Sequence, residues 1–268
     1  MATIPKKVLD RYFKTVFNFQ KILKNALDRD INEADTVVIC QDILSEIFGF
    51  DKYTEITTEY AIRGTYCDLA IKIDEKIQYL IEVKSIGTSL KEQHLKQAID
   101  YGVNKGVQWV VLTNGIVWDL YKVRFERPID KDLVLSLNML EVNPRKNDDQ
   151  QKLFLLSKRG LSKSIREEYY EHIKSVNRNV IGALILSKPI ITKIRSDLKK
   201  ITAGLKIELD EIEKIITHEV IKRDVIEDEE TIKAMKRVAK IGKKNPRKPK
   251  TPKSETEFPE SNPATNIS

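Results

Sequence analysis

The sequence predicts an α/β domain built on a mixed β-sheet core flanked by helices, followed by an all-α region and a disordered basic tail. Three observations predict this class. The spacing of apolar residues changes from helical to alternating near residue 53, strand-like and helical segments then alternate, and no strand-like segment follows residue 145. We therefore expect three parts: residues 1–145, 146–232 and 233–268.

Two helices are expected before the first strand. Apolar residues recur at helical spacing from Val8 to Asp28, which predicts a long amphipathic helix. Asn32 has the character of an N-cap, with Asp35 three residues later, and so predicts a second helix that ends near Gly49.

Three strands and a third helix follow. The strand-like segments are residues 54–62, 65–73 and 77–85. The last two are separated by a turn at Asp74–Lys76, which predicts an antiparallel hairpin. Ser89 and Glu92 have the spacing of a capping box and predict the start of the next helix.

Two more strands complete the expected sheet, and amphipathic helices fill the region after it. Residues 108–113 and 116–123 are joined at Asn114–Gly115, a strong signal for a hairpin. Beyond Arg145 the predicted helices are residues 150–160, 165–186, 189–201 and 208–226. Pro189 falls at the first turn of the third of them.

The positive charge of the chain is concentrated in the tail. Residues 233–268 contain ten Lys or Arg and three Glu, which accounts for the whole net charge of +7. This segment is rich in Pro, Ser and Lys beyond Ile241, a composition typical of disorder. Two interpretations stay open: the tail binds phosphates of DNA or RNA without sequence preference, or it is only a solvated terminus.

Several protein classes are disfavoured by the composition. No apolar stretch approaches the roughly 20 residues of a membrane span, and the N-terminal segment lacks the apolar run of a signal peptide. We therefore expect a cytoplasmic protein without a membrane partner. Cys40 and Cys67 are expected to be reduced thiols, and the absence of CxxC or paired His spacing argues against zinc.

The strand at residues 77–85 carries two opposite charges on one face. Since residues two apart project from the same face, Glu82 and Lys84 point together, away from the apolar residues between and beside them. In the preceding strand Asp68 projects opposite to Leu69. The turn lies almost midway between Asp68 and Glu82, so the hairpin predicts that these carboxylates are neighbours.

Two carboxylates in a semi-buried site repel each other unless a cation lies between them. A divalent ion with a preference for oxygen ligands, Mg²⁺ or alternatively Mn²⁺, would resolve the repulsion. Lys84 could then polarise a water or stabilise charge on an attacked phosphate, an arrangement suited to phosphodiester hydrolysis. The alternative is that Asp68 is a strand-end charge and that Glu82 and Lys84 form a solvated pair on an edge strand.

Residues 68–85 and 94–121 resemble the PD-(D/E)xK nuclease superfamily. The nearest resemblance is to the N-terminal nuclease domain of type I restriction enzyme R subunits and to stand-alone relatives described as predicted type IV restriction endonucleases. The resemblance covers roughly residues 30–125 and implies a restriction-endonuclease-like fold. Cys67 stands where the superfamily name has proline.

The resemblance implies a role for each matching residue. The motif acid falls on Asp68, and the E-x-K pair falls on Glu82 and Lys84. It implies that Asp68, Glu82 and the carbonyl group of Val83 bind Mg²⁺, with Mn²⁺ as the alternative. Lys84 would orient or activate the attacking water.

Two further motifs of the family have counterparts on helices. The Q-x-x-x-Y motif falls on Gln97 and Tyr101, four residues apart on one helix face, where they could brace the catalytic loop, touch nucleic acid or be ordinary boundary residues. An acidic residue on an early helix is assigned to Glu33, with Glu46 as the alternative.

The resemblance implies a metal-dependent endonuclease that cleaves DNA in restriction or anti-phage defence. A non-cleaving nucleic-acid-binding module or partner subunit is one alternative, and an RNA-directed or toxin-like nuclease is another. The expected partner is nucleic acid; a homodimer would suit double-strand cleavage. The sequence contains no G-x-x-x-x-G-K-[ST], the phosphate-binding motif of an R-subunit motor, so we expect no motor in this chain. A separate specificity or helicase partner is therefore also considered.

Overall fold

The computed structural model describes residues 3–62, 65–161 and 163–241, and they divide into two compact units. The first unit extends to Ser175 and the second begins at Val176. The expectation of a disordered tail concerns mainly residues 242–268, which lie outside the described residues.

A mixed β-sheet forms the centre of the first unit, as predicted. Within the described residues it has six strands, which follow one another across the sheet in chain order. Strands β3 and β4 are parallel, and every other neighbouring pair is antiparallel. The strands are β1 (Ile56–Ile62), β2 (Thr65–Ile73), β3 (Lys76–Val83), β4 (Trp109–Thr113), β5 (Val117–Arg124) and β6 (Asp130–Asn138).

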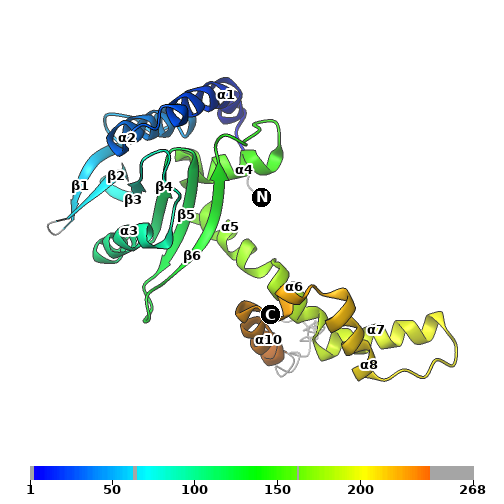
Figure 1. Ribbon diagram of the computed structural model, residues 1–268. Coiled ribbons are helices and arrows are strands. Elements are labelled where there is room, and N and C mark those ends of the chain that lie inside the picture. Colours follow the sequence, from blue (N-terminus) through cyan, green and yellow to red (C-terminus); the bar gives the residue numbers. More distant parts are fainter. Residues whose placement is uncertain (1–2, 63–64, 162, 242–268) are drawn as a thin grey trace, which may run out of the picture. The chain divides into compact units, whose positions relative to one another are not determined.

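Helices cover both faces of this sheet (Figure 1). Helix α3 crosses over between the parallel strands β3 and β4 and packs on Val110 and Leu112. Helices α1, α2, α4 and α5 share a core with residues of the other face, including Ile81 and Trp118. The helical segments of the first unit are α1 (Lys6–Asp28), α2 (Glu33–Asp42), η1 (Ile43–Ile47), α3 (Glu92–Lys105), α4 (Asn147–Leu156), η2 (Lys158–Leu161) and α5 (Lys163–Ser175).

Two local signals in the sequence are confirmed. The side chain of Asn32 caps α2 by accepting a hydrogen bond from the backbone N–H of Asp35 at 2.9 Å. Asn114 and Gly115 join β4 to β5, with Gly115 at φ 81°, a conformation that favours glycine. The last two strands of the predicted five-strand set are therefore connected as expected.

The prediction was wrong at the start of α3 and at β6. Helix α3 begins at Glu92, because Thr88 closes a turn with Ser85 and Lys91, in an extended conformation, is the N-cap residue. Strand β6 was not predicted. The pairing of β5 with β6 shifts register after Leu120, which breaks the alternation of apolar residues, so that Leu133 is 52% exposed whereas its two successors are buried.

The first unit continues past residue 145, where the sequence suggested a boundary. Leu153, Phe154 and Tyr170 are buried in the same core as the sheet. The hydroxyl group of Tyr79 on β3 donates a 2.8 Å hydrogen bond to the carbonyl oxygen of Leu155. Helices α4 and α5 therefore complete the first unit, and the helical region does not begin with them.

We expect a chain that ends at Ser175 to fold and a chain that ends at residue 145 to fail. The shorter chain loses the buried side chains of α4 and α5, each worth roughly 1.5–3 kcal/mol, in a domain whose total stability is about 5–15 kcal/mol. Both tryptophans of the chain, Trp109 and Trp118, lie in the first unit, so urea unfolding followed by their fluorescence measures this difference. Equal unfolding midpoints for the two chains would contradict the assignment of α4 and α5.

The second unit is all-helical and has its own small core around Ile191, Ile212 and Ile216. The single helix predicted for residues 165–186 is broken at Asn177. The side chain of Asn177 caps α6 by accepting hydrogen bonds from the backbone N–H groups of Asn179 and Val180. Helix α10 continues beyond residue 232, where the tail was expected to begin. The helices are α6 (Arg178–Ile185), α7 (Lys188–Ile201), α8 (Leu209–Ile215), η3 (Ile216–Val220), α9 (Arg223–Ile226) and α10 (Glu229–Ile241).

Cys40 and Cys67 are free and buried, as predicted. Burial, with the charges of Glu82 and Asp68, raises the pKa of Cys67 to about 12, so this thiol remains protonated near neutral pH. Across the described part of the chain, no helix combines the length and apolar character that a membrane crossing requires.

Candidate active site

The β2–β3 hairpin places Asp68 and Glu82 beside each other. The two strands pair with Leu69 opposite Ile81, and this register brings Asp68 opposite Glu82. The Oδ2 atom of Asp68 accepts a 2.7 Å hydrogen bond from the backbone N–H of Val83, which crosses from one strand to the next. The proximity expected from the hairpin turn is thus present in the structure.

Glu82 is a buried carboxylate with one oxygen unsatisfied. Its side chain is almost inaccessible at 2% exposure, and its Oε1 accepts a 2.9 Å hydrogen bond from the Nζ of Lys84. Its Oε2 has no hydrogen-bond partner among the described residues. Burial, and then the negative charge of Asp68, raise the pKa of Glu82 to about 7 in spite of Lys84.

Lys84 lies between the acids at the end of β3. Its Nζ is 2.9 Å from Glu82 Oε1 and 3.5 Å from Glu33 Oε2. Burial by itself would lower the pKa of Lys84, but the hydrogen bond to Glu82 and the surrounding negative charges raise it above the ordinary value. We call Glu33, Asp68, Glu82 and Lys84 the acid–lysine cluster.

The cluster carries an excess of negative charge that suits a bound cation. Burial and the charge of Glu33 raise the pKa of Asp68 as well, although Val83 N–H and Lys84 oppose the shift. The buried, unpartnered Oε2 of Glu82 is an oxygen donor of the kind that Mg²⁺ and Mn²⁺ prefer. In the described residues no three acidic, His or Cys side chains converge on one metal position, and the ammonium group of Lys84 lies among the acids instead. The residues fit a divalent ion in their chemistry, with Lys84 as the counter-charge in this state.

Part of the chain matches a known protein family. A family model for the type I restriction enzyme R protein N terminus matches residues 39–130. This segment therefore resembles the R protein N terminus. Neither the search of curated proteins nor the search of solved structures found a match.

The match to the R protein N terminus confirms the resemblance expected from the sequence and supports a nuclease-like role for this part of the chain. It contains Asp68, Glu82 and Lys84, and it also contains Gln97 and Tyr101. It excludes Glu33, α1 and the second unit.

Glu33 joins the cluster from outside the segment that resembles the R protein. As the first residue of α2, directly after the cap Asn32, it reaches Lys84. The negative charge of Glu33 also raises the pKa of Asp68, Glu82 and Lys84. Glu33 and the alternative acid, Glu46 on η1, are both exposed. It is the contact with Lys84 that favours Glu33 as the acid contributed by the early helices.

Gln97 and Tyr101 lie behind the cluster rather than in it. The amide group of Gln97 donates a 2.6 Å hydrogen bond to the Tyr101 hydroxyl group. Tyr101 is 3% exposed and packs with Ala70 and Leu80, two residues before Glu82 on β3. The burial of Tyr101 favours a bracing role for that residue, whereas Gln97 is exposed on α3.

Contacts that hold the chain directly after Lys84 were not predicted from the sequence. The backbone N–H of Lys84 donates a 2.8 Å hydrogen bond to the carbonyl oxygen of Thr113 on β4. A side chain at Gly87 would place its Cβ 2.6 Å from Asp30 Oδ1, so the loop before α2 closely approaches the turn that follows Lys84. The segment Leu112–Gly115 was interpreted as a hairpin turn and as part of the family resemblance, but no structural role was assigned to Asn114, although the polar residues next to Gly115 were the available signal.

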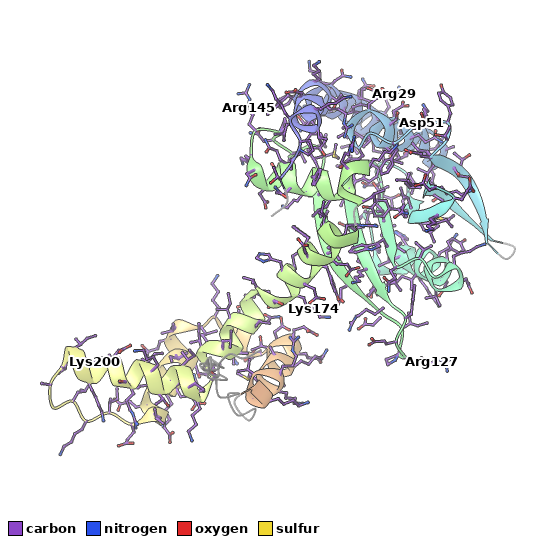
Figure 2. The ribbon with its side chains drawn as sticks, turned by 180° about the vertical axis from the view of Figure 1, so that it is seen from behind. Arg29, Asp51, Arg127, Arg145, Lys174 and Lys200 are labelled. Atoms are coloured by element: carbon purple, nitrogen blue, oxygen red, sulfur yellow. The ribbon has the colours of Figure 1, made fainter. Side chains whose placement is uncertain are left out.

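A separate hollow lies between α1 and α2. Its volume is about 530 Å³, and it does not include a member of the acid–lysine cluster. Arg29, which is labelled in Figure 2, Lys21 and Asn25 line it together with apolar residues such as Val38. The chemistry of the candidate site is therefore carried by the strand ends and not by this hollow.

Proposed function

We propose that the first unit is a metal-dependent endonuclease that hydrolyses phosphodiester bonds of DNA in restriction or anti-phage defence. The observation that carries the proposal is a carboxylate pair, the half-buried Asp68 and the buried Glu82, with an unsatisfied oxygen of Glu82 beside the ammonium group of Lys84. A pair of this kind is costly to bury and is favoured where a cation and a phosphate bind.

Asp68, Glu82 and the carbonyl group of Val83 would hold Mg²⁺, or alternatively Mn²⁺. A divalent ion bound there would lower the pKa of a coordinated water and neutralise charge on the phosphate. Glu33 contributes negative charge at the edge of the cluster. Lys84 orients the attacking water or stabilises the charge that develops on the phosphate.

DNA is the proposed substrate because residues 39–130 match a restriction enzyme segment. That match also makes subunits with specificity or motor functions the natural partners, since this chain contains no G-x-x-x-x-G-K-[ST]. Pairing of two copies would supply one active site for each DNA strand.

Cleavage of plasmid and phage DNA, modified and unmodified, tests the proposal. We expect nicked or linear product with Mg²⁺ or Mn²⁺ and none with EDTA. Asp68→Asn should reduce the rate at least about 100-fold, since even outer-shell partners of metal ligands cost 10–100-fold when changed. Asp74→Asn is the matched control, because Asp74 is exposed in the turn of the same hairpin at φ 49° and asparagine tolerates that conformation.

Other outcomes would each identify an alternative. Cleavage of RNA with DNA left intact would indicate an RNA-directed nuclease. Binding of DNA without cleavage under any metal condition would indicate a non-cleaving module. Equal cleavage by the wild type and Asp68→Asn would place the activity outside the acid–lysine cluster.

A further inference from the structure

The turn that follows Lys84 is closed by its own hydrogen bonds. The backbone N–H of Thr88 donates to the carbonyl oxygen of Ser85 at 2.9 Å, and the hydroxyl groups of these two residues are 2.6 Å apart. Ile86, within the turn, is 1% exposed and packs in the main core. The backbone of Lys84 therefore leaves the sheet directly into a fixed turn.

The side chain of Asn114 joins this turn to the β4–β5 connection. Its Nδ2 donates to the carbonyl oxygen of Ile86 at 3.2 Å and to that of Thr88 at 2.9 Å. Its Oδ1 accepts from the N–H groups of Ile116 at 3.1 Å and Val117 at 2.8 Å. Asn114 is 7% exposed; its bonds with Ile86 and Ile116 are buried, and those with Thr88 and Val117 are partly buried. Leaving these bonds unmade would therefore be costly.

A side-chain amide is well matched to this position. Two donors and an acceptor with two lone pairs are required on one short side chain, a set that asparagine provides and aspartate does not. On its other side the turn is approached by Asp30 at Gly87. The turn is thus held from both sides, immediately after the residue whose Nζ must meet Glu82 and Glu33.

We propose that Asn114 is a positioning residue that fixes the Ser85–Thr88 turn and thereby holds Lys84 against the acids of the cluster. The effect on cleavage rests on the proposed nuclease function, whereas the effect on the turn does not. Asn114 acts through the backbone and touches neither substrate nor metal.

Three variants test this role in the full chain. Asn114→Asp removes both donors and keeps the acceptor, and Asn114→Ser removes the amide without adding charge. Gln20→Glu is the matched control: the Gln20 Nε2 donates to two carbonyl oxygens, of Met139 at 2.9 Å and of Val142 at 2.7 Å, in a loop outside the cluster. Each amide-to-acid change therefore removes two donated bonds to backbone carbonyl groups.

Hydrogen exchange of the metal-free proteins is the first measurement. We expect the N–H groups of Lys84 and Thr88 to exchange about tenfold faster or more in both Asn114 variants, with no change in Gln20→Glu. Acceleration that extends equally to the core residue Trp118 would indicate global destabilisation and would overturn the local role. Unchanged exchange in Asn114→Ser would also overturn it.

Single-turnover cleavage is the second measurement. We expect the rate of the chemical step to fall at least about tenfold in both Asn114 variants, with DNA affinity within about twofold of the wild type and Gln20→Glu unaffected. Faster exchange at the turn with normal cleavage would show that the turn does not position Lys84. If the wild type cleaves no nucleic acid, the nuclease proposal fails, and the exchange data still decide whether Asn114 holds the turn.

Discussion

The Lys84→Met protein should cleave DNA about 10²- to 10⁴-fold more slowly than the wild type. Methionine retains much of the aliphatic stem of lysine and removes only its charge and hydrogen-bond donors. In the structure the ammonium group is the group placed to contact both Glu82, at 2.9 Å, and Glu33, at 3.5 Å. Its loss therefore removes the cation that would orient water or stabilise the phosphate.

The same variant should bind Mn²⁺ roughly tenfold more tightly than the wild type, because a positive charge that opposes a second cation is gone. Lys84 neutralises the acids in the metal-free protein, so an incoming divalent ion has to compete with it. Calorimetry at pH 8.5 measures this effect where competition by protons for Glu82 is small. A lower rate with a higher metal affinity would separate the role of Lys84 from that of a metal ligand.

Lys72→Met on the neighbouring strand β2 is the control. Lys72 also forms an ion pair on the hairpin, with Glu75 at 3.3 Å, but that pair lies at the turn end of the hairpin, four residues along β2 from Asp68. We expect it to change neither cleavage nor Mn²⁺ affinity. Equal cleavage by Lys84→Met and the wild type would show that Lys84 is not catalytic, and weaker Mn²⁺ binding would show that it organises the acids rather than competing with the ion.

The features that sequence analysis predicted are those set by neighbouring residues. Asn32 and Asp35 define the start of α2 through one local hydrogen bond. The hairpin between β2 and β3 follows from the alternation of side chains and a turn at Asp74–Lys76, and it brings Asp68 to Glu82 without information from the rest of the chain. The core of the candidate site was accessible for this reason.

The features that were missed depend on contacts between distant segments. The amide group of Asn114 binds carbonyl groups 26 and 28 residues earlier, and no local pattern specifies these acceptors. The amphipathic pattern of α4 predicts a helix but cannot show that Leu153 joins the core of the sheet. Strand β6 was hidden because its pairing shifts register, which removes the alternation that identifies a strand.

The Glu82→Gln protein should be more stable than the wild type at pH 8 and about equally stable at pH 4.5, in the absence of metal. The pKa of Glu82 is about 7 in the folded protein, against about 4.3 in an unfolded chain. Between these values the folded state holds the proton more tightly, so the stability from protonated Glu82 is complete at low pH and is lost as the pH rises through 7. The difference corresponds to about 4 kcal/mol at pH 8, which glutamine recovers because it carries no charge.

Thermal unfolding followed by the fluorescence of Trp109 and Trp118 measures this effect in the first unit alone, because both tryptophans of the chain lie there. Glu55→Gln is the control, since Glu55 pairs with Lys158 outside the cluster.

Addition of Mg²⁺ should raise the thermal unfolding midpoint of the wild type and leave that of Glu82→Gln unchanged, because a ligand stabilises only the folded form that binds it. Without Mg²⁺, Glu82→Gln would be the more stable protein, and at saturating Mg²⁺ the wild type would be. If Mg²⁺ stabilises both proteins equally, Glu82 is not a metal ligand; if the two proteins have equal midpoints at pH 8 without metal, Glu82 does not carry the buried charge that the proposed site requires.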